Sequence, residues 1–112
     1  MKIVGLTFEI VRASPAVAEF HARVQLDGPP GDCEIKGRVM GPRSPTVSTI
    51  EVSYPATFKE VYDDNVALRF AVPEPNLWTP EAPFTYEVTV DLYSCGLLHD
   101  TRTGVVAFRS LH

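Results

Sequence analysis

The sequence predicts an all-β protein, built as an antiparallel sandwich of seven or eight strands. Apolar and polar residues alternate with a period of two in successive segments, which is typical of strands with one buried face. The ten prolines and seven glycines fall mostly between these segments, where they indicate turns. Since no stretch combines helical apolar spacing with a proline-free sequence, two packed sheets are the expected architecture.

The first two predicted strands cover residues 2–11 and 17–26 and are separated by Ser14-Pro15. The second strand has the cleanest alternation in the chain. A turn rich in Asp, Gly and Pro follows it at residues 27–32. The side chains expected to face inward are Val4, Leu6, Phe8 and Ile10 in the first strand, and Ala18, Phe20, Ala22, Val24 and Leu26 in the second.

The middle of the chain predicts a third strand at residues 33–40, which Gly41-Pro42 ends, and a fourth at residues 46–54 with weaker alternation. Residues 58–62 fit either a short edge strand or an irregular connector. The side chains expected to face inward are Cys33, Ile35, Gly37 and Val39 in the third strand, and Ile50 and Val52 in the fourth.

The last third of the chain begins with a turn at residues 63–65. Residues 73–83 contain four prolines, so they are not expected to form a ladder strand. We expect the next strand at residues 83–93. A longer connection at residues 96–103 then leads to a final strand at residues 104–110. The expected inward residues are Val66, Leu68, Phe70 and Val72 before the prolines, then Tyr86, Val88, Val90 and Leu92, and finally Val106 and Phe108.

Length and composition bound the class of protein. The 112 residues suit one domain, residues 1–112, with 45% hydrophobic and 21% charged residues. A net charge of −4 argues against a nucleic-acid partner. No apolar run is long enough for a membrane-spanning helix, and Thr7 and Glu9 interrupt any signal-peptide core. We therefore expect a cytoplasmic chain with no membrane partner, or a piece of a longer protein.

The segment before the strand at residues 83–93 is the most specific motif. Residues 75–86 read PNLWTPEAPFTY. They resemble the Trp-(Ser/Thr)-Pro-Glu-x-Pro-(Tyr/Phe) segment of the immunoglobulin-like sandwich domain in family 2 glycoside hydrolases, the β-galactosidase, β-glucuronidase and β-mannosidase types. Thr85 stands where that family usually has Leu. The matching residues are Trp78, Pro80, Pro83 and Tyr86, with a looser match later at Asp100, Arg102, Gly104 and Arg109.

The resemblance implies an immunoglobulin-like topology and the supporting middle domain of those enzymes. Trp78 would fold over the open end of the sandwich, the prolines would hold the connector extended, and Tyr86 would begin the next strand from the core side. In that family the two catalytic glutamates lie on a separate barrel. The resemblance therefore implies no catalytic residue, cofactor or metal in this chain, and it implies other domains or subunits of a glycoside hydrolase as partners.

The residues themselves show no arrangement suited to catalysis. Glycoside hydrolysis needs two carboxyl groups across a cleft, whereas the adjacent Asp63 and Asp64 are expected in a turn. The histidines, at positions 21, 99 and 112, lack metal-ligand spacing. Whether Cys33 and Cys95 form a disulfide stays open, although Cys95 falls out of phase with the inward side of its strand.

Two functions remain from the sequence. The first is a non-catalytic immunoglobulin-like module that acts as structural support or as a docking surface. The alternative is a stand-alone module that binds carbohydrate or protein, with Tyr54, Phe58, Tyr62 and Tyr93 as candidate aromatic platforms. Homo-oligomerisation through an edge strand is also plausible, and residues 46–62 are the best candidate for that edge.

Overall fold

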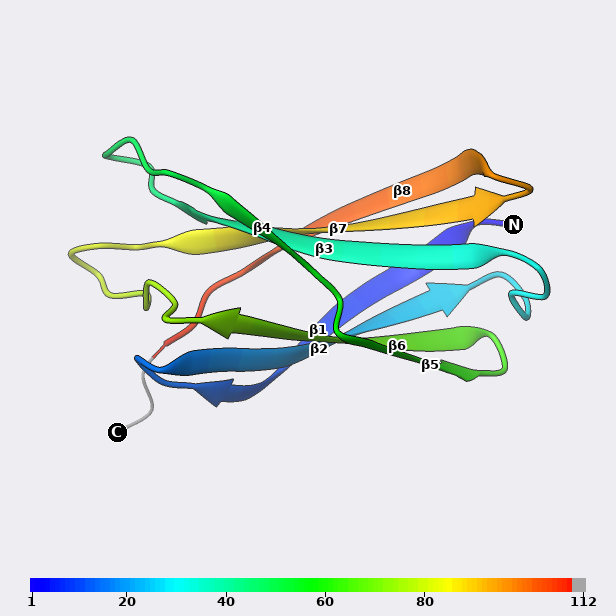
Figure 1. Cartoon of the computed structure of the whole chain (residues 1–112), viewed down its shortest axis with the longest axis horizontal. Coiled ribbons are helices and arrows are strands. Elements are labelled where there is room, and N and C mark those ends of the chain that lie inside the picture. Colours follow the sequence, from blue (N-terminus) through cyan, green and yellow to red (C-terminus); the bar gives the residue numbers. More distant parts are fainter. Residues whose placement is uncertain (110–112) are drawn as a thin grey trace.

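Two antiparallel four-stranded sheets pack face to face (Figure 1). This computed structural model describes residues 1–109. The first sheet has the order β1-β2-β6-β5 and the second has the order β4-β3-β7-β8. The strands are β1 (Ile3–Ala13), β2 (Val17–Leu26), β3 (Glu34–Arg43), β4 (Val52–Pro55), β5 (Phe58–Tyr62), β6 (Asn65–Pro73), β7 (Thr85–Ser94) and β8 (Leu97–Val106).

The strand order is that of an immunoglobulin constant-type sandwich with one extra strand, β4, beside β3. The all-β sandwich predicted from the alternation is therefore confirmed. The turns β2–β3, β5–β6 and β7–β8 lie at one end of the sandwich (Figure 1). The β6–β7 connector and the last described residues lie at the other end, beside the β1–β2 and β3–β4 loops.

The core comes from the three strands with the clearest alternation. The inward residues predicted for β2, β6 and β7 are all buried, as are Val106 and Phe108. Phe20 of β2 stacks on Phe70 of β6 with ring centroids 5.0 Å apart. Phe108 fills the space between the sheets and contacts both Phe20 and Tyr86. The period of two thus identified the buried face of each central strand.

The prediction for β1 was partly wrong. Leu6 and Phe8 pack against the core as expected, but Val4 is 54% exposed and Ile10 is 40% exposed, while Ile3 is buried. The register with β2 shifts between Ile3 and Gly5 and again between Ile10 and Arg12. The first irregularity adds Val4 to β1 and turns its side chain away from the core. Ile10 pairs with Phe20 and so lies on the predicted face, but it is exposed because β1 is an edge strand.

The prediction for the fourth strand was also wrong in its extent and inward face. β4 contains only Val52–Pro55, and Ile50 is 90% exposed in the loop before it. Val52 is exposed as well, whereas Tyr54 packs against the core. A short edge strand is held by one neighbour, so alternation in this region did not reflect burial.

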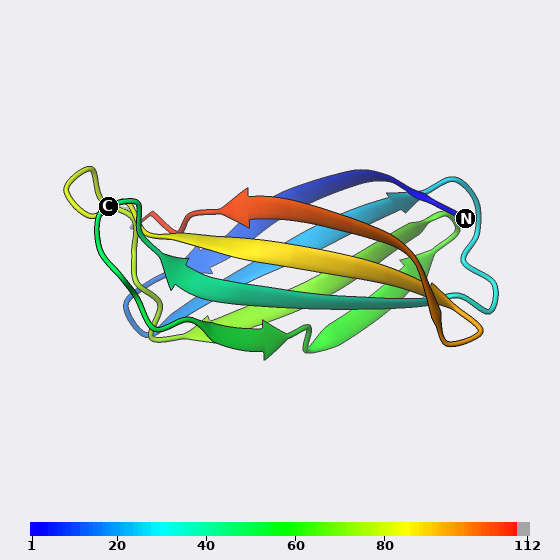
Figure 2. The same cartoon turned by 90° about the horizontal axis from the view of Figure 1, so that it is seen from above.

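Residues 58–62, left open between strand and connector, form the edge strand β5. The chain changes sheets immediately before it. The Ala56 N–H donates to the Gly37 carbonyl of the second sheet, and the next N–H, that of Thr57, donates to the Arg69 carbonyl of the first sheet, each at 2.9 Å. Strands β4 and β5 therefore close one side of the sandwich in succession (Figure 2).

Two further boundaries differ from the prediction. β3 continues through Gly41-Pro42 to Arg43, with an irregular register after Met40. β8 begins at Leu97 and ends at Val106, so residues 96–103 are not a long connection; Ser110, placed in the final strand, lies outside the described residues. Cys95 and Gly96 have φ of 51° and 76°, which suits a tight two-residue hairpin turn.

Side chains of β8 bind the backbone of β1 where the two edge strands face each other. The Ile3 N–H donates to Asp100 Oδ2 at 2.8 Å, and Arg102 Nη2 donates to the Ile3 carbonyl at 2.7 Å. The hydrogen bond from Ile3, followed by that from Thr101, lowers the pKa of Asp100 below its usual 3.8. Asp100 and Arg102 thus satisfy the backbone groups of Ile3 across the gap between the sheets.

The close approach of the sheets at Gly37 can be tested by adding one methyl group. A Cβ at this position would lie 2.7 Å from Leu68 Cδ1 and 2.9 Å from Phe70 Cζ. We expect Gly37→Ala to lower the free energy of unfolding by about 1–3 kcal/mol, measured by denaturant titration, because the core is overpacked. Gly28→Ala is the control, since a Cβ there meets nothing within 4 Å. Equal effects of the two substitutions would contradict this packing.

The contact between Asp100 and Ile3 predicts a pH dependence. Because the folded pKa is lowered, the contribution of Asp100 to stability is present above its usual pKa of 3.8 and is lost as the pH falls through the lowered value. Asp100→Asn should therefore destabilise the protein at neutral pH, and its deficit should shrink under acidic conditions. Unfolding titrations across pH, with Asp32→Asn in an exposed turn as the control, would measure this. A deficit that is independent of pH would count against it.

Candidate functional site

The connector of residues 74–84 joins β6 to β7 and folds into tight turns. The Thr79 N–H donates to the Ala82 carbonyl at 3.1 Å, and the Ala82 N–H donates back to the Thr79 carbonyl at 3.2 Å. Pro80 takes the second position of this turn, where its fixed φ fits. Pro83 lies inside a second, smaller turn, because the Phe84 N–H donates to the Ala82 carbonyl at 2.9 Å. The expectation that the prolines hold the connector extended was therefore wrong.

Trp78 joins the connector to the C-terminal segment. Its N–H donates to the Phe108 carbonyl at 2.8 Å, and Trp78 forms a parallel bridge with Arg109. The Arg109 guanidinium lies over the indole, with Cζ 4.0 Å from the ring centroid. The indole is half-buried. The connector that carries it lies at the same end of the sandwich as the last described residues (Figure 1). A hydrogen bond and a cation–π contact thus hold together two segments thirty residues apart.

Tyr86 anchors the other end of the connector. It is 2% exposed, and its hydroxyl accepts a hydrogen bond from the Asn76 N–H at 2.9 Å. Burial raises the pKa of the hydroxyl. This is the tyrosine corner of immunoglobulin-like folds, in which a Tyr at the start of the sixth core strand binds upstream backbone. A Cβ on Gly41 would lie 2.5 Å from Tyr86 Cδ1, so Gly41 leaves the space that the ring needs.

Gly104 lies apart from the connector, on β8, the edge strand of the second sheet. It pairs with Val88 in the register of β7 and β8. A Cβ at Gly104 would lie 2.6 Å from Phe8 Cε2. The missing side chain therefore lets the Phe8 ring of β1 pack against the second sheet. The sequence motif placed Trp78, Tyr86 and Gly104 in one group, whereas the structure brings Trp78 and Tyr86 together and leaves Gly104 elsewhere.

Sequence reasoning missed several partners of these residues. Gly41 was assigned only as the end of a strand, and no role was given to Arg109 or to the backbone of Asn76. Gly41 and Arg109 meet their partners from distant parts of the chain, and the Asn76 N–H meets Tyr86 across the irregular connector, so periodicity carries no signal for these contacts. The order Asp100, Arg102, Gly104 and Arg109 was the only sequence signal that pointed to part of this set.

Most ionic side chains with clear partners lie on the outer face of the second sheet. Arg38 Nη1 donates to Asp91 Oδ2 at 2.9 Å, and the Thr101 hydroxyl donates to Asp91 Oδ1 at 2.9 Å. Arg43 binds two carboxylates, those of Glu51 and Glu87. The hydrogen bond to Glu51 is the main cause that raises the Arg43 pKa. These groups link neighbouring strands and the β3–β4 loop to one another.

The titratable residues considered as chemical candidates are dispersed. Asp63 and Asp64 form the predicted turn, and Asp64 accepts hydrogen bonds from Gln25 and Asn65. Cys33 and Cys95 are free cysteines, and Cys95 is exposed in the hairpin turn. In residues 1–109 no group of three or more His, Cys, Asp or Glu could hold a metal. His21 and His99 lie on different sheets, and His112 is outside the described residues.

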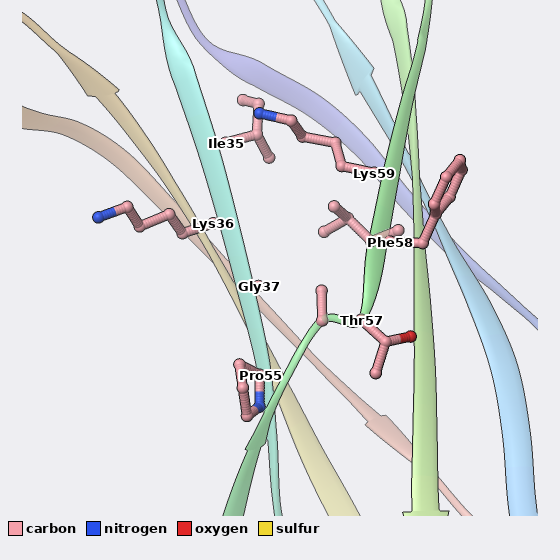
Figure 3. A pocket seen from close by; sticks show the side chains of 9 residues that line it. Ile35, Lys36, Gly37, Pro55, Thr57, Phe58 and Lys59 are labelled. Atoms are coloured by element: carbon pink, nitrogen blue, oxygen red, sulfur yellow. The ribbon is translucent and has the colours of Figure 1, made fainter.

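A cavity opens between β3 and β5, where the chain changes sheets (Figure 3). Its volume is about 330 Å³, and Ile35, Ala56 and Leu68 contribute apolar lining. Lys59 extends across its opening, whereas the Lys36 amine points away (Figure 3) and lies 3.9 Å from Glu34. The cavity therefore has an apolar wall and one ammonium group at its rim.

The four aromatic residues considered for ligand binding do not form one platform. Tyr54 packs partly into the core from β4, and Tyr93 lies half-buried on β7 with the Lys36 amine 5.3 Å from its ring centroid. Phe58 and Tyr62 are exposed on β5, and the Arg69 guanidinium covers the Phe58 ring, with Cζ 4.6 Å from the ring centroid.

In the part of the chain described here, no helix is long and apolar enough to cross a membrane.

Comparison with known proteins gives the family. Residues 4–109 match the model described as glycosyl hydrolases family 2. The chain belongs to glycosyl hydrolases family 2. The resemblance of the connector to this family is thereby confirmed. No curated protein sequence matches this family 2 chain.

Solved structures share the fold of this family 2 domain. Bifidobacterium dentium β-glucuronidase aligns with a TM-score of 0.63 at 14% identity over 99% of the chain, and a β-glycosidase from Bacteroides vulgatus with 0.61 at 19% over 99%. Bacteroides uniformis β-glucuronidase aligns with 0.53 at 24% over 93%. The chain spans 13–19% of the length of these three proteins, so it resembles one non-catalytic domain of larger enzymes.

The tyrosine corner of the family 2 domain can be tested without changing the shape of the core. Tyr86→Phe removes the acceptor of the Asn76 N–H, and we expect the free energy of unfolding to fall by about 1 kcal/mol with an unchanged denaturant slope. Tyr62→Phe, which removes an exposed hydroxyl, is the matched control. If both variants were as stable as the parent chain, the corner would not stabilise the fold.

Proposed function

We propose that the chain is a non-catalytic supporting module of a family 2 glycoside hydrolase, joined to the catalytic part or docked against it. The observation that carries this proposal is the anchoring of the C-terminal segment. Phe108 is fully buried, its carbonyl is bound by Trp78, and Arg109 stacks on the indole. These contacts hold the chain against the sandwich as far as Arg109.

The use of the acidic side chains supports a structural role. A general acid in glycoside hydrolysis needs a raised pKa, whereas the pKa of Asp100 is lowered by backbone hydrogen bonds. Asp91 is held by Arg38 and Thr101 across three strands of the second sheet. Glu51 and Glu87 share one arginine on the surface. These carboxylates link strands and loops, and they do not line the apolar cavity between β3 and β5.

An assay of hydrolysis tests the non-catalytic part of the proposal. The purified chain should release no nitrophenol from nitrophenyl β-galactoside, β-glucuronide or β-mannoside above the buffer rate. Hydrolysis that fell on Glu87→Gln substitution would overturn the proposal. Titration with the corresponding free sugars should likewise show no saturable binding, since the four candidate aromatic residues do not form one platform.

The supporting role is tested in the intact family 2 hydrolase that contains or binds this domain. Trp78→Ala removes the stack with Arg109. We expect faster thermal inactivation and a kcat unchanged in enzyme not yet inactivated, because Trp78 holds the exit of the domain and takes no part in the chemistry. Val47→Ala, in an exposed loop, is the control. Unchanged thermal inactivation in the Trp78 variant would contradict a supporting role for this contact.

A further inference from the structure

The free edge of β5 offers backbone groups for pairing. The Leu26 N–H donates to the Asp64 carbonyl, so the even-numbered residues of β6 turn their backbone groups toward β2 and the odd-numbered residues turn theirs toward β5. The odd-numbered residues pair with the even-numbered residues of β5: Phe58 with Arg69, Glu60 with Ala67, and Tyr62 with Asn65. The backbone N–H and C=O groups of Lys59 and Val61 therefore point away from β6, toward the unpaired edge of the sheet.

Exposed apolar side chains accompany these free groups. Phe58 is 46% exposed, Val61 50% and Tyr62 54%. The strand lies at the outer edge of the first sheet, along one side of the sandwich (Figure 2). A sheet edge that combines free backbone donors with apolar side chains is suited to the addition of another strand.

The charges of β5 select between the ways in which two copies could pair. If the two-fold axis passed Lys59, each Lys59 would face the other; if it passed Glu60, two Glu60 carboxylates would face each other. Directly opposed like charges are unfavourable in an antiparallel pair. An axis at Val61 instead places Glu60 opposite Tyr62 and brings Lys59 beside the acidic turn Asp63-Asp64 of the other copy.

We propose that two copies of this chain associate through β5, antiparallel, about a two-fold axis at Val61. The two first sheets then form one continuous eight-stranded sheet, and the interface is the same surface on both copies. The backbone N–H and C=O groups of the two Val61 residues hydrogen-bond to each other across the axis. Each Lys59 side chain lies beside the Asp63-Asp64 turn of the other copy. A second copy of this chain is the proposed partner because, in this register, Lys59 of each copy lies beside the acidic residues Asp63 and Asp64 of the other.

Sedimentation equilibrium over a concentration series, with the chain as it is, tests the dimer. Val61→Pro removes an N–H that no bond to β6 uses, so it should leave the far-ultraviolet circular dichroism unchanged and abolish the dimer. Lys59→Glu places like charges together and should weaken dimerisation by about tenfold or more, and added salt should weaken the dimer of the parent chain. Val4→Thr, on the opposite edge strand of the same sheet, is the control and should dimerise normally. A monomer throughout the series, or an oligomer that persists in the folded Val61→Pro variant, would overturn the proposal.

Oxidative cross-linking tests the register. In a C33A/C95S background, V61C should form an intermolecular disulfide, because each copy of position 61 faces the other across the axis within disulfide reach. E60C should not, because in this register its two copies are displaced along the strands beyond about 7 Å. Efficient cross-linking of E60C with none of V61C would show that the strands pair in another register and would overturn the assignment.

Discussion

The packing of Phe108 between Phe20 and Tyr86 is the contact on which the rest of this sandwich depends. Its ring centroid lies 5.5 Å from that of Phe20 in the first sheet and 5.0 Å from that of Tyr86 in the second. Phe20 in turn stacks on Phe70. Aromatic side chains provide large buried areas, so this cluster joins the two sheets through a residue that belongs to no strand.

The position of Phe108 also determines the geometry of the connector. Because its carbonyl accepts from Trp78 while its ring contacts Tyr86, both ends of the motif meet the same residue. The turn at Pro80 then has to fit between two anchored points. This explains why a segment with several prolines is ordered without ladder pairing. It also links the family motif to Phe108 and Arg109, whose anchoring supports the proposed role.

The sides of the sandwich are completed in different ways. Between β1 and β8, the side chains of Asp100 and Arg102 bind the backbone of Ile3. On the opposite side, the chain itself crosses from the second sheet to the first at Ala56 and Thr57. The crossing places β5 at the edge of the first sheet, with the backbone N–H and C=O groups of Lys59 and Val61 facing outward. The first arrangement satisfies backbone groups within the chain, while the second leaves them free for a partner.

The sequence by itself determined the all-β class, the inward faces of β2, β6 and β7, and the family connector, because central strands bury one face completely and alternation follows burial there. It failed at the edges: Val4 lies outward because of a register shift, Ile10 shares the face of Phe20 but is exposed on an edge strand, and β8 shows no alternation because both its faces are largely exposed. Only the tertiary structure decided the partners of Trp78, Tyr86 and Gly104. Those contacts join segments distant in the chain, and neither local propensity nor periodicity records which distant segments meet.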